Sequence, residues 1–253
     1  MKTLEIQLIR NATLLVNIDG KKILIDAMLG EVGSIKTVPL TRNKKRNPIV
    51  PLTVSLQKIT DIDAILITHR HFDHFDEEAK KILPKNIPLF CQPQDEIRIR
   101  KSGFNNVTSI DNFHKWEGIK IYRVNGNHGT GLAGLLMGKV SGFVFEDRKG
   151  KKLYIAGDTV YNKVVEKVLE YYQPDVTVVN SGEAQLIFGN PITMTKEDVL
   201  KVANISNSIV VAVHLEAVNH CSLKRIDLNN YINKKGLYKN VIIPNDGEIM
   251  SFT

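Results

Sequence analysis

Short apolar runs alternate with polar turns along the chain, and most of the runs have the length and composition of β-strands. Leu4–Ile9 and Thr13–Ile18 are rich in Leu, Ile and Val, and Asp19-Gly20 is typical of a hairpin turn leading into Ile23–Asp26. Ile62–Thr68 is strongly apolar, which predicts a buried strand. The same pattern predicts further strands at Leu89–Gln92, Ile119–Val124, Val140–Glu146, Leu153–Ala156, Val176–Val179, Ile209–Val213 and Val241–Ile243.

Segments with helical spacing lie between these strands. Val160–Tyr172 carries apolar residues three and four positions apart, and Thr195 and Asp198 are spaced as in a capping box at the start of a helix. The helices expected from such signals are Asp76–Leu83, Glu96–Lys101, Val160–Tyr172, Thr195–Ala203 and Leu223–Ile232.

One long segment fits neither pattern. Ala27–Thr60 contains three prolines and several basic residues with weak periodicity, so we expect a long loop, and long ordered loops are often functional. No Gly/Ser-rich or Pro-rich linker divides the chain. Two sheets packed together with helices outside, in a single domain over residues 1–253, are therefore expected.

Composition excludes several protein classes. The 43% hydrophobic and 24% charged residues are those of an ordinary globular chain rather than a disordered one. Apolar stretches such as Ile209–Val213 fall far short of the ~20 residues of a membrane span. Glu5 interrupts what would be the apolar core of a signal peptide, so we expect a cytoplasmic location. Cys91 and Cys221 are too few for a disulfide framework or a cysteine-rich zinc site.

The net charge of +7 is modest and comes largely from lysines. Pairs such as Lys21-Lys22 and Lys151-Lys152 stand at expected turns and helix ends, which favours a solvated surface over a nucleic-acid footprint. The densest cluster of basic residues is Arg42–Arg46, inside the long loop.

The most informative stretch is His69-Arg70-His71-Phe72-Asp73-His74. Four potential metal ligands lie within six residues, directly after an apolar strand. In a tight turn, His69 and His71 can point one way while Asp73 and His74 point another, so one loop can serve two ions. A surface cluster or a set of core histidines is the alternative, but crowding such groups without a cation would require costly desolvation. The spacing therefore predicts a metal site.

The motif His69-x-His71-x-Asp73-His74 after an apolar strand resembles the signature of the metallo-β-lactamase-fold hydrolases. The resemblance continues in the family's order: Gly126–Gly129 is similar to the segment of the third metal histidine, Leu153–Thr159 to the strand before the bridging aspartate, and Val211–His214 to the strand before the last histidine. Within the superfamily the chain is most similar to the UlaG-like group of cytoplasmic metal-dependent hydrolases, which includes ascorbate-phosphate lactonases. This resemblance implies an α+β fold, a four-layer αββα sandwich of two mixed sheets flanked by helices.

The resemblance also implies a dinuclear metal site. It assigns one divalent ion to His69, His71 and His128, and the other to Asp73, His74 and His214. Asp158 would bridge both ions. Histidine and carboxylate ligands suit zinc best, with manganese or iron as alternatives.

His214 and His220 compete for the last ligand position. His214 follows its apolar strand directly, so we assign the metal to His214 and a substrate contact to His220. Cys221 is expected to be a small buried side chain, and His114 a surface residue. Glu183 and Gln185, in the expected loop 182–194, are candidates to reach a polar substrate.

Charge favours hydrolysis of a small anionic molecule. Two divalent cations, two carboxylates and a bridging hydroxide would leave a residual positive charge, and the cations would lower the pKa of bound water toward ~7. No Ser or Cys nucleophile is then needed. We expect attack by the metal-bridging hydroxide on a lactone, ester, amide or phosphoester, with Asp73 and Asp158 as the catalytic carboxylates and Asp73 also able to move a proton.

Three other functions are compatible with parts of the sequence. A diiron oxygen- or nitric-oxide-reducing enzyme ranks low, because that family tends to carry Glu where this chain has His71, and adds a flavin domain. A metal-dependent phosphodiesterase or nuclease ranks second, since Arg42–Arg46 could contact phosphates, although no clamp domain is present. A non-catalytic binding protein on a degraded hydrolase scaffold is disfavoured, because the loss of catalysis usually goes with the loss of metal ligands and the ligand set here is complete. We expect a small-molecule substrate and no membrane partner; a homo-oligomer is possible.

Replacing Asp158 tests the bridging role. Asp158→Ala should abolish turnover and lower the metal content of the purified protein, because both ions would lose a shared ligand. Metal analysis together with an activity assay checks this. Normal activity with an unchanged metal content would contradict the assignment.

Overall fold

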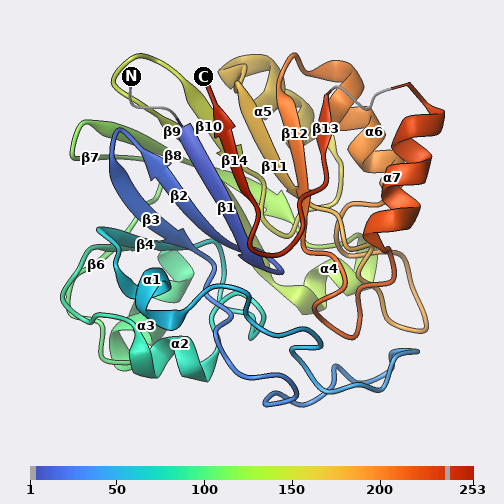
Figure 1. The fold of residues 1–253 in the computed structure, drawn as a ribbon, viewed down its shortest axis with the longest axis horizontal. Coiled ribbons are helices and arrows are strands. Elements are labelled where there is room, and N and C mark those ends of the chain that lie inside the picture. Colours follow the sequence, from blue (N-terminus) through green and yellow to red (C-terminus); the bar gives the residue numbers. More distant parts are fainter. Residues whose placement is uncertain (1–3, 237–239) are drawn as a thin grey trace.

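The computed structural model describes residues 4–236 and 240–253, which form two seven-stranded sheets packed face to face (Figure 1). The first sheet has the order β14 (Ile249–Phe252), β1 (Leu4–Arg10), β2 (Thr13–Ile18), β3 (Lys21–Ile25), β4 (Ala64–Ile67), β5 (Leu89–Cys91) and β6 (Val107–Ser109). Its first four strands pair antiparallel, and β3 to β6 pair parallel.

The second sheet is also mixed. Its order is β13 (Val241–Ile242), β12 (Ile209–Val213), β11 (Val176–Asn180), β10 (Lys152–Ile155), β9 (Lys139–Glu146), β8 (Ile119–Asn127) and β7 (Phe113–Trp116). Strands β10 to β13 run parallel, and β7 to β10 are antiparallel.

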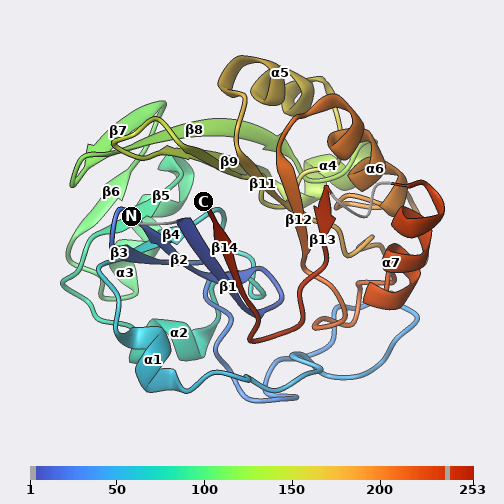
Figure 2. The same ribbon diagram turned by 45° about the horizontal axis from the view of Figure 1, so that its top comes forward.

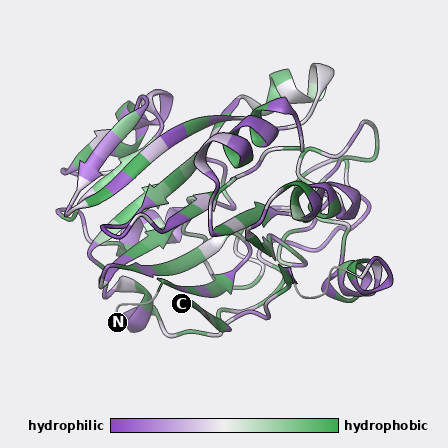
Figure 3. Cartoon of the chain, turned by 90° about the horizontal axis from the view of Figure 1, so that it is seen from above, coloured by the Kyte–Doolittle hydropathy of each residue, from purple (hydrophilic) through white to green (hydrophobic). Residues whose placement is uncertain are grey.

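Helices cover the outer face of each sheet (Figure 2). Apolar side chains of α2 (Glu77–Ile82) and α3 (Glu96–Lys101) pack with the outer face of the first sheet, and α1 (Leu56–Thr60) lies on the same side. The second sheet is covered by α5 (Lys163–Tyr172), α6 (Lys196–Ile205) and α7 (Arg225–Lys234). A third apolar cluster fills the space between the sheets. Figure 3 shows the long apolar stretches along the strands. The predicted four-layer αββα arrangement is confirmed.

Several elements differ from the sequence pattern. Strands β6, β7 and β14 are short, and half of the residues of β7 are exposed, so they carry little apolar signal. The glycine-rich loop expected between β8 and β9 contains α4 (Gly131–Met137). Helix α5 begins only after Asn162, whose side chain accepts hydrogen bonds from Val164 N and Val165 N. The capping box of Thr195 and Asp198 is confirmed.

His114 corrects one expectation. It was expected at the surface, but it lies half-buried in β7 and its ring packs against Phe90, with 5.3 Å between ring centroids. An alternating edge strand turns every second side chain toward the core, which explains this placement.

The predicted long loop is held to the sheets by buried polar groups. Arg10, at the end of β1, is fully buried, and its guanidinium donates to the carbonyl oxygens of Met28 (2.6 Å), Gly30 (2.9 Å) and Val50 (3.0 Å). Burial lowers the pKa of Arg10 to about 10, so the group stays charged at neutral pH. The loop therefore has a defined course across the end of both sheets. No helix in the described part of the chain is long and apolar enough to cross a membrane.

Arg10→Met tests this anchor. The variant keeps the apolar volume but leaves three carbonyl oxygens without their donor, so it should lower the free energy of unfolding by about 3 kcal/mol and the Tm by about 6–12 °C. Thermal melts of the metal-loaded protein check it. Arg98→Met, on the exposed face of α3, is the matched control and should change the Tm by less than about 2 °C. Equal Tm values for the two variants would contradict the anchoring role.

Candidate metal centre

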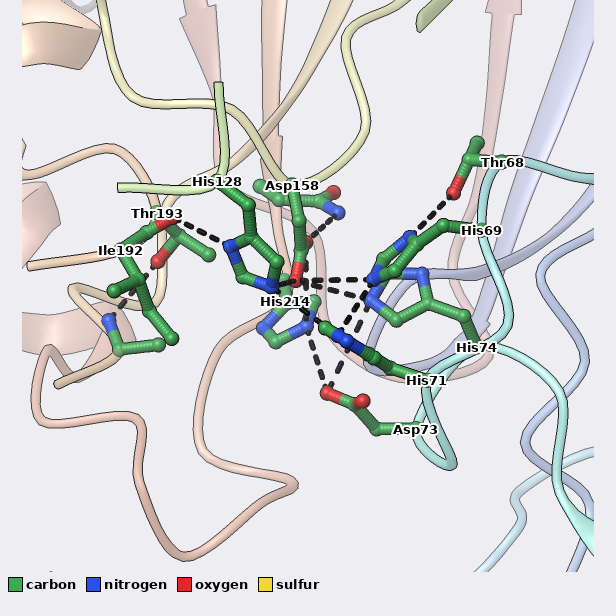
Figure 4. A network of polar contacts seen from close by, with 12 residues as sticks. Thr68, His69, His71, Asp73, His74, His128, Asp158, Ile192, Thr193 and His214 are labelled. Carbon is green, nitrogen blue, oxygen red and sulfur yellow. Dashed lines mark hydrogen bonds and ion pairs between the residues drawn. The ribbon is translucent and has the colours of Figure 1, made fainter. Parts of the chain in front are cut away.

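The predicted site residues follow directly after strands of both sheets. His69 to His74 form the loop after β4, His128 follows β8, Asp158 comes three residues after β10, and His214 follows β12. These strands end at the same side of the sandwich, where the two sheets meet. Figure 4 shows the side chains converging from the two halves of the chain.

Three histidines form one group. His69 Nε2 lies 3.0 Å from His71 Nδ1, and His128 Nε2 lies 3.2 Å from the same His71 atom. His69 and His128 are buried, and His71 is half-buried. The three nitrogen atoms lie within 4.8 Å of one another, as the ligands of one ion would.

The second group contains two carboxylates and two histidines. His214 Nε2 lies 3.2 Å from Asp73 Oδ2 and 3.6 Å from Asp158 Oδ1. His74 Nε2 lies 3.3 Å from Asp158 Oδ2 and 3.9 Å from Asp73 Oδ2. All four side chains are buried, and one atom of each lies within 4.8 Å of the other three.

Asp158 lies between the two groups. Its Oδ2 is 3.4 Å from His128 Nε2 and 3.9 Å from His69 Nε2, while the same oxygen faces His74 in the other group. Its Oδ1 accepts a hydrogen bond of 2.6 Å from Asn180 Nδ2, which fixes the orientation of the carboxylate. One side chain can therefore contact cations held by either group.

Unsatisfied atoms show that the site fits metal ions. Asp73 Oδ2, His74 Nε2 and His214 Nε2 are buried without a hydrogen-bond partner, although buried polar atoms normally have one. All three atoms face the same space. A cation there would satisfy them together, and neutral imidazole with carboxylate oxygen is a donor set that zinc, manganese and iron accept.

The histidines of the first group favour the neutral form. Burial lowers the pKa of His69 well below its usual value, and the imidazoles of His74 and His71 lower it further. Burial also lowers the pKa of His71 and of His128. Neutral imidazole is the form that binds metal ions.

The second group is strongly coupled. Burial opposes a charge on His74, but the carboxylates of Asp158 and Asp26 outweigh it and raise its pKa to about 10. Burial likewise opposes ionisation of Asp73 and Asp158, yet the imidazoles beside them hold the pKa of both carboxyls well below the usual range. The two carboxylates thus create a negative field that a buried metal cation would neutralise.

Hydrogen bonds on the far side of the rings orient the histidines. Asp26 Oδ2 accepts from His74 Nδ1 at 2.8 Å, and His69 Nδ1 lies 3.2 Å from Thr68 Oγ1, which itself donates to Asp26. The Ile192 carbonyl oxygen lies 2.8 Å from His128 Nδ1. Such partners fix which ring nitrogen faces the metal.

Asp26, Thr68 and Asn180 were not predicted as site residues from the sequence. Each stands at or just after the end of an apolar strand, where a polar residue breaks the pattern. That signal marks a polar environment but does not show which ring or carboxylate the side chain meets.

The seven predicted ligands are brought together, and the other candidates lie around them. His220 is buried, with its Nε2 4.0 Å from Asp73 Oδ2. Cys221 was expected to be a small buried side chain. Its Sγ lies 3.3 Å from His214 Nδ1, so the thiol also contacts a predicted ligand. Glu183 lines a hollow together with Lys196 and Tyr231, and its contact with a substrate stays a prediction.

Comparisons with known proteins agree with this geometry. The family model described as "Beta-lactamase superfamily domain" matches residues 21–215. The UPF0173 protein YddR of Bacillus subtilis is 42% identical over 249 residues, covering 96% of this chain and 98% of that protein. A UPF0173 metal-dependent hydrolase of Rubrobacter xylanophilus is 26% identical over 171 residues, covering 65% of this chain and 64% of the relative.

Two solved structures cover nearly the whole chain. An isothiocyanate hydrolase from Delia radicum gut bacteria is 36% identical with a TM-score of 0.93, covering 98% of this chain and 99% of that one. A possible metal-dependent hydrolase from Veillonella parvula is 31% identical with a TM-score of 0.95, and both chains are covered completely.

Asp26→Asn tests the support of the second group. The amide cannot both accept from His74 Nδ1 and keep its contacts to Thr68, so metal affinity should fall about 10- to 100-fold. A competition titration with a chromogenic chelator measures this. Asp61→Asn, an exposed partner of Lys22, is the control and should bind metal as the unmodified protein does. Unchanged affinity in Asp26→Asn would show that the hydrogen bond does not orient the ligand.

Proposed function

This chain belongs to the β-lactamase superfamily and is a metal-dependent hydrolase, and we propose that it holds two divalent ions and hydrolyses a small organic molecule. The observation that carries the proposal is the position of Asp158 Oδ2, 3.4 Å from His128 Nε2 and 3.3 Å from His74 Nε2. A carboxylate between two groups of ligand atoms is the arrangement that a shared ligand requires.

In this proposal His69, His71 and His128 would hold one ion, Asp73, His74 and His214 would hold the other, and Asp158 would be shared between them. Zinc is the first choice, with manganese or iron as alternatives. When bound, the ions would supply an activated water near neutral pH and an electrophile for the substrate's oxygen or sulfur.

The protein's own residues orient the reacting groups. Asn180 and Asp26 hold Asp158 and His74 in place. Asp73 Oδ2, 3.2 Å from His214 Nε2, lies at the centre and would be the atom that takes up a proton during hydrolysis. His220 is buried, and burial lowers its pKa, so its neutral ring can exchange a proton with a substrate atom at the centre.

The substrate class is a small molecule with an electrophilic carbon. Isothiocyanates are the first compounds to test, because the 36% identical hydrolase from Delia radicum gut bacteria is described as acting on them. Water would add to the central carbon, the C–N bond would break, and an amine and carbonyl sulfide would leave. Lactones and esters follow as the next classes.

A nuclease is the weaker alternative. Two of the basic side chains that could contact phosphates are engaged within their own loop: Lys44 Nζ donates to Thr41 O, and Arg46 donates to Gly33 O and Ser34 O. We further propose that the chain acts in the cytoplasm and without a membrane or nucleic-acid partner.

Metal stoichiometry tests the dinuclear centre. The purified protein should bind about two equivalents of metal, whereas His71→Ala and His214→Ala should each retain about one, because they belong to different groups. Metal analysis and thermal melts with and without a chelator provide the readout. His114→Ala, a histidine outside the site, should retain both equivalents.

One equivalent in the unmodified protein and none in either site variant would show a mononuclear centre. Hydrolysis is tested with phenyl isothiocyanate, a γ-lactone and bis(p-nitrophenyl) phosphate. Turnover of at least one compound should disappear with chelator and return with added metal. Turnover that chelation leaves unchanged would refute the metal-dependent role.

A further inference from the structure

A pocket lies directly beside the metal centre. It shares His220 and Cys221 with the surroundings of that centre, since His220 Nε2 lies 4.0 Å from Asp73 Oδ2 and Cys221 Sγ lies 3.3 Å from His214 Nδ1. Its other walls come from the long loop and from the segment after β11. A molecule whose reactive carbon reaches the centre would therefore extend into this pocket.

The wall from the long loop is fixed by one residue of the same pocket, Asn219. Its side-chain oxygen accepts from Val38 N and Asn47 Nδ2, both at 2.9 Å. Its Nδ2 donates to Thr41 Oγ1 at 2.6 Å and to Asn43 O at 2.8 Å. Because the amide is fully used and buried, it holds residues 38–47 beside His220 as a fixed surface and offers nothing further to a ligand.

Only one cation of the basic cluster is available to the pocket. Lys44 and Arg46 donate to carbonyl oxygens of the loop itself. Among the described contacts, Arg42 and the ammonium of Lys45 have no partner, and of these two only Arg42 lines the pocket. The guanidinium is well shaped for a carboxylate or phosphate.

His220 provides a second, independent indication of a ligand. It is only 8% exposed, and its Nδ1 is buried without a hydrogen-bond partner in the described structure. Leaving such an atom unpaired is unfavourable, so a polar group of a bound molecule would stabilise it.

The lip of the pocket is apolar. Leu40 and Ile187 directly adjoin the lining residues Thr41 and Leu186 in the sequence and are 59% and 44% exposed. Ile187 N donates to Leu40 O at 2.7 Å, which joins the two sides of the lip. The apolar body of a small molecule could cover these side chains.

We propose that this pocket selects small organic anions: Arg42 binds a carboxylate or phosphate group of the substrate, the lip contacts its apolar body, and His220 contacts the part next to the reacting carbon. This inference rests on the proposed hydrolysis and names the substrate class for it. Arg42 is a specificity residue here, and the seven residues of the metal centre keep their roles.

Pairs of substrates with the same reactive group, one anionic and one neutral, distinguish an effect of Arg42 on binding the anion from an effect on the reaction itself. We would compare 4-isothiocyanatobenzoate with phenyl isothiocyanate, and 4-acetoxybenzoate with phenyl acetate, on the metal-loaded protein. Arg42→Gln should raise KM for the anionic member of each pair about tenfold, leave kcat nearly unchanged, and change the neutral member by less than about twofold. Lys45→Gln, which removes a neighbouring charge outside the pocket, should alter neither. Equal losses for anionic and neutral members, or equal effects of the two variants, would overturn the proposal.

Direct binding tests the pocket even if none of these compounds is hydrolysed. Terephthalate and 4-carboxyphenyl phosphate carry a second anionic group that benzoate lacks, and they distinguish a carboxylate from a phosphate. On the metal-loaded protein one anionic group of each compound, including the single carboxylate of benzoate, would bind at the metal centre, so only the dianions place a second anionic group at Arg42. Calorimetry should therefore show that Arg42→Gln weakens one or both dianions about tenfold while the Kd of benzoate and the metal content stay constant. Unchanged affinity for both dianions would refute the pocket. Absence of chelator-sensitive turnover with this binding retained would refute the hydrolysis alone.

Discussion

Seven imidazole and carboxylate side chains, six of them buried, occupy one small space, and this is the arrangement on which the rest of the structure depends. Without a cation, the negative charge of the buried carboxylates must be balanced by protonated histidines such as His74. Ring nitrogens such as His74 Nε2 and His214 Nε2 are then buried without a hydrogen-bond partner. Such a group is expensive to bury, so it persists only where the surrounding fold holds it rigidly. Bound metal ions would stabilise the same group of side chains, because each ring nitrogen and carboxylate oxygen would contact a cation.

The sandwich supplies that rigidity. His69, His128, Asp158 and His214 each stand within three residues of the end of a strand, and His71, Asp73 and His74 lie in the short loop that follows β4, so the backbone of the site is held by the sheets. His214 shows how strongly the fold determines the site, because it adopts a left-handed backbone conformation (φ 66°) that non-glycine residues rarely occupy, and its backbone N–H donates to Asn11 O. Gly182 passes so close to the His214 carbonyl that a side chain there would clash, which keeps the strand end tightly packed.

The long loop links the centre to its surroundings. Arg10 anchors its start and Asn219 its middle, and Asn219 directly precedes His220. The same short segment therefore contacts the metal centre on one side and fixes the wall of the adjoining pocket on the other. A shift of this segment would therefore change both the surroundings of the metal centre and the shape of the pocket. The polar residues of the long loop hold the segment in position.

The sequence by itself determined the fold class and indicated the side chains that the structure brings together at the candidate metal centre. Apolar runs of strand length indicate which segments form buried strands. The His-x-His-x-Asp-His spacing brings four candidate ligands together because they lie in one short loop. Short or half-exposed elements such as β7 and α4 escaped prediction because they bury too little apolar surface to leave a pattern. Only the tertiary structure decided that Asp26 supports His74 and that Arg42 rather than Arg46 lines the pocket. These outcomes depend on contacts between residues far apart in the chain, which no local spacing encodes.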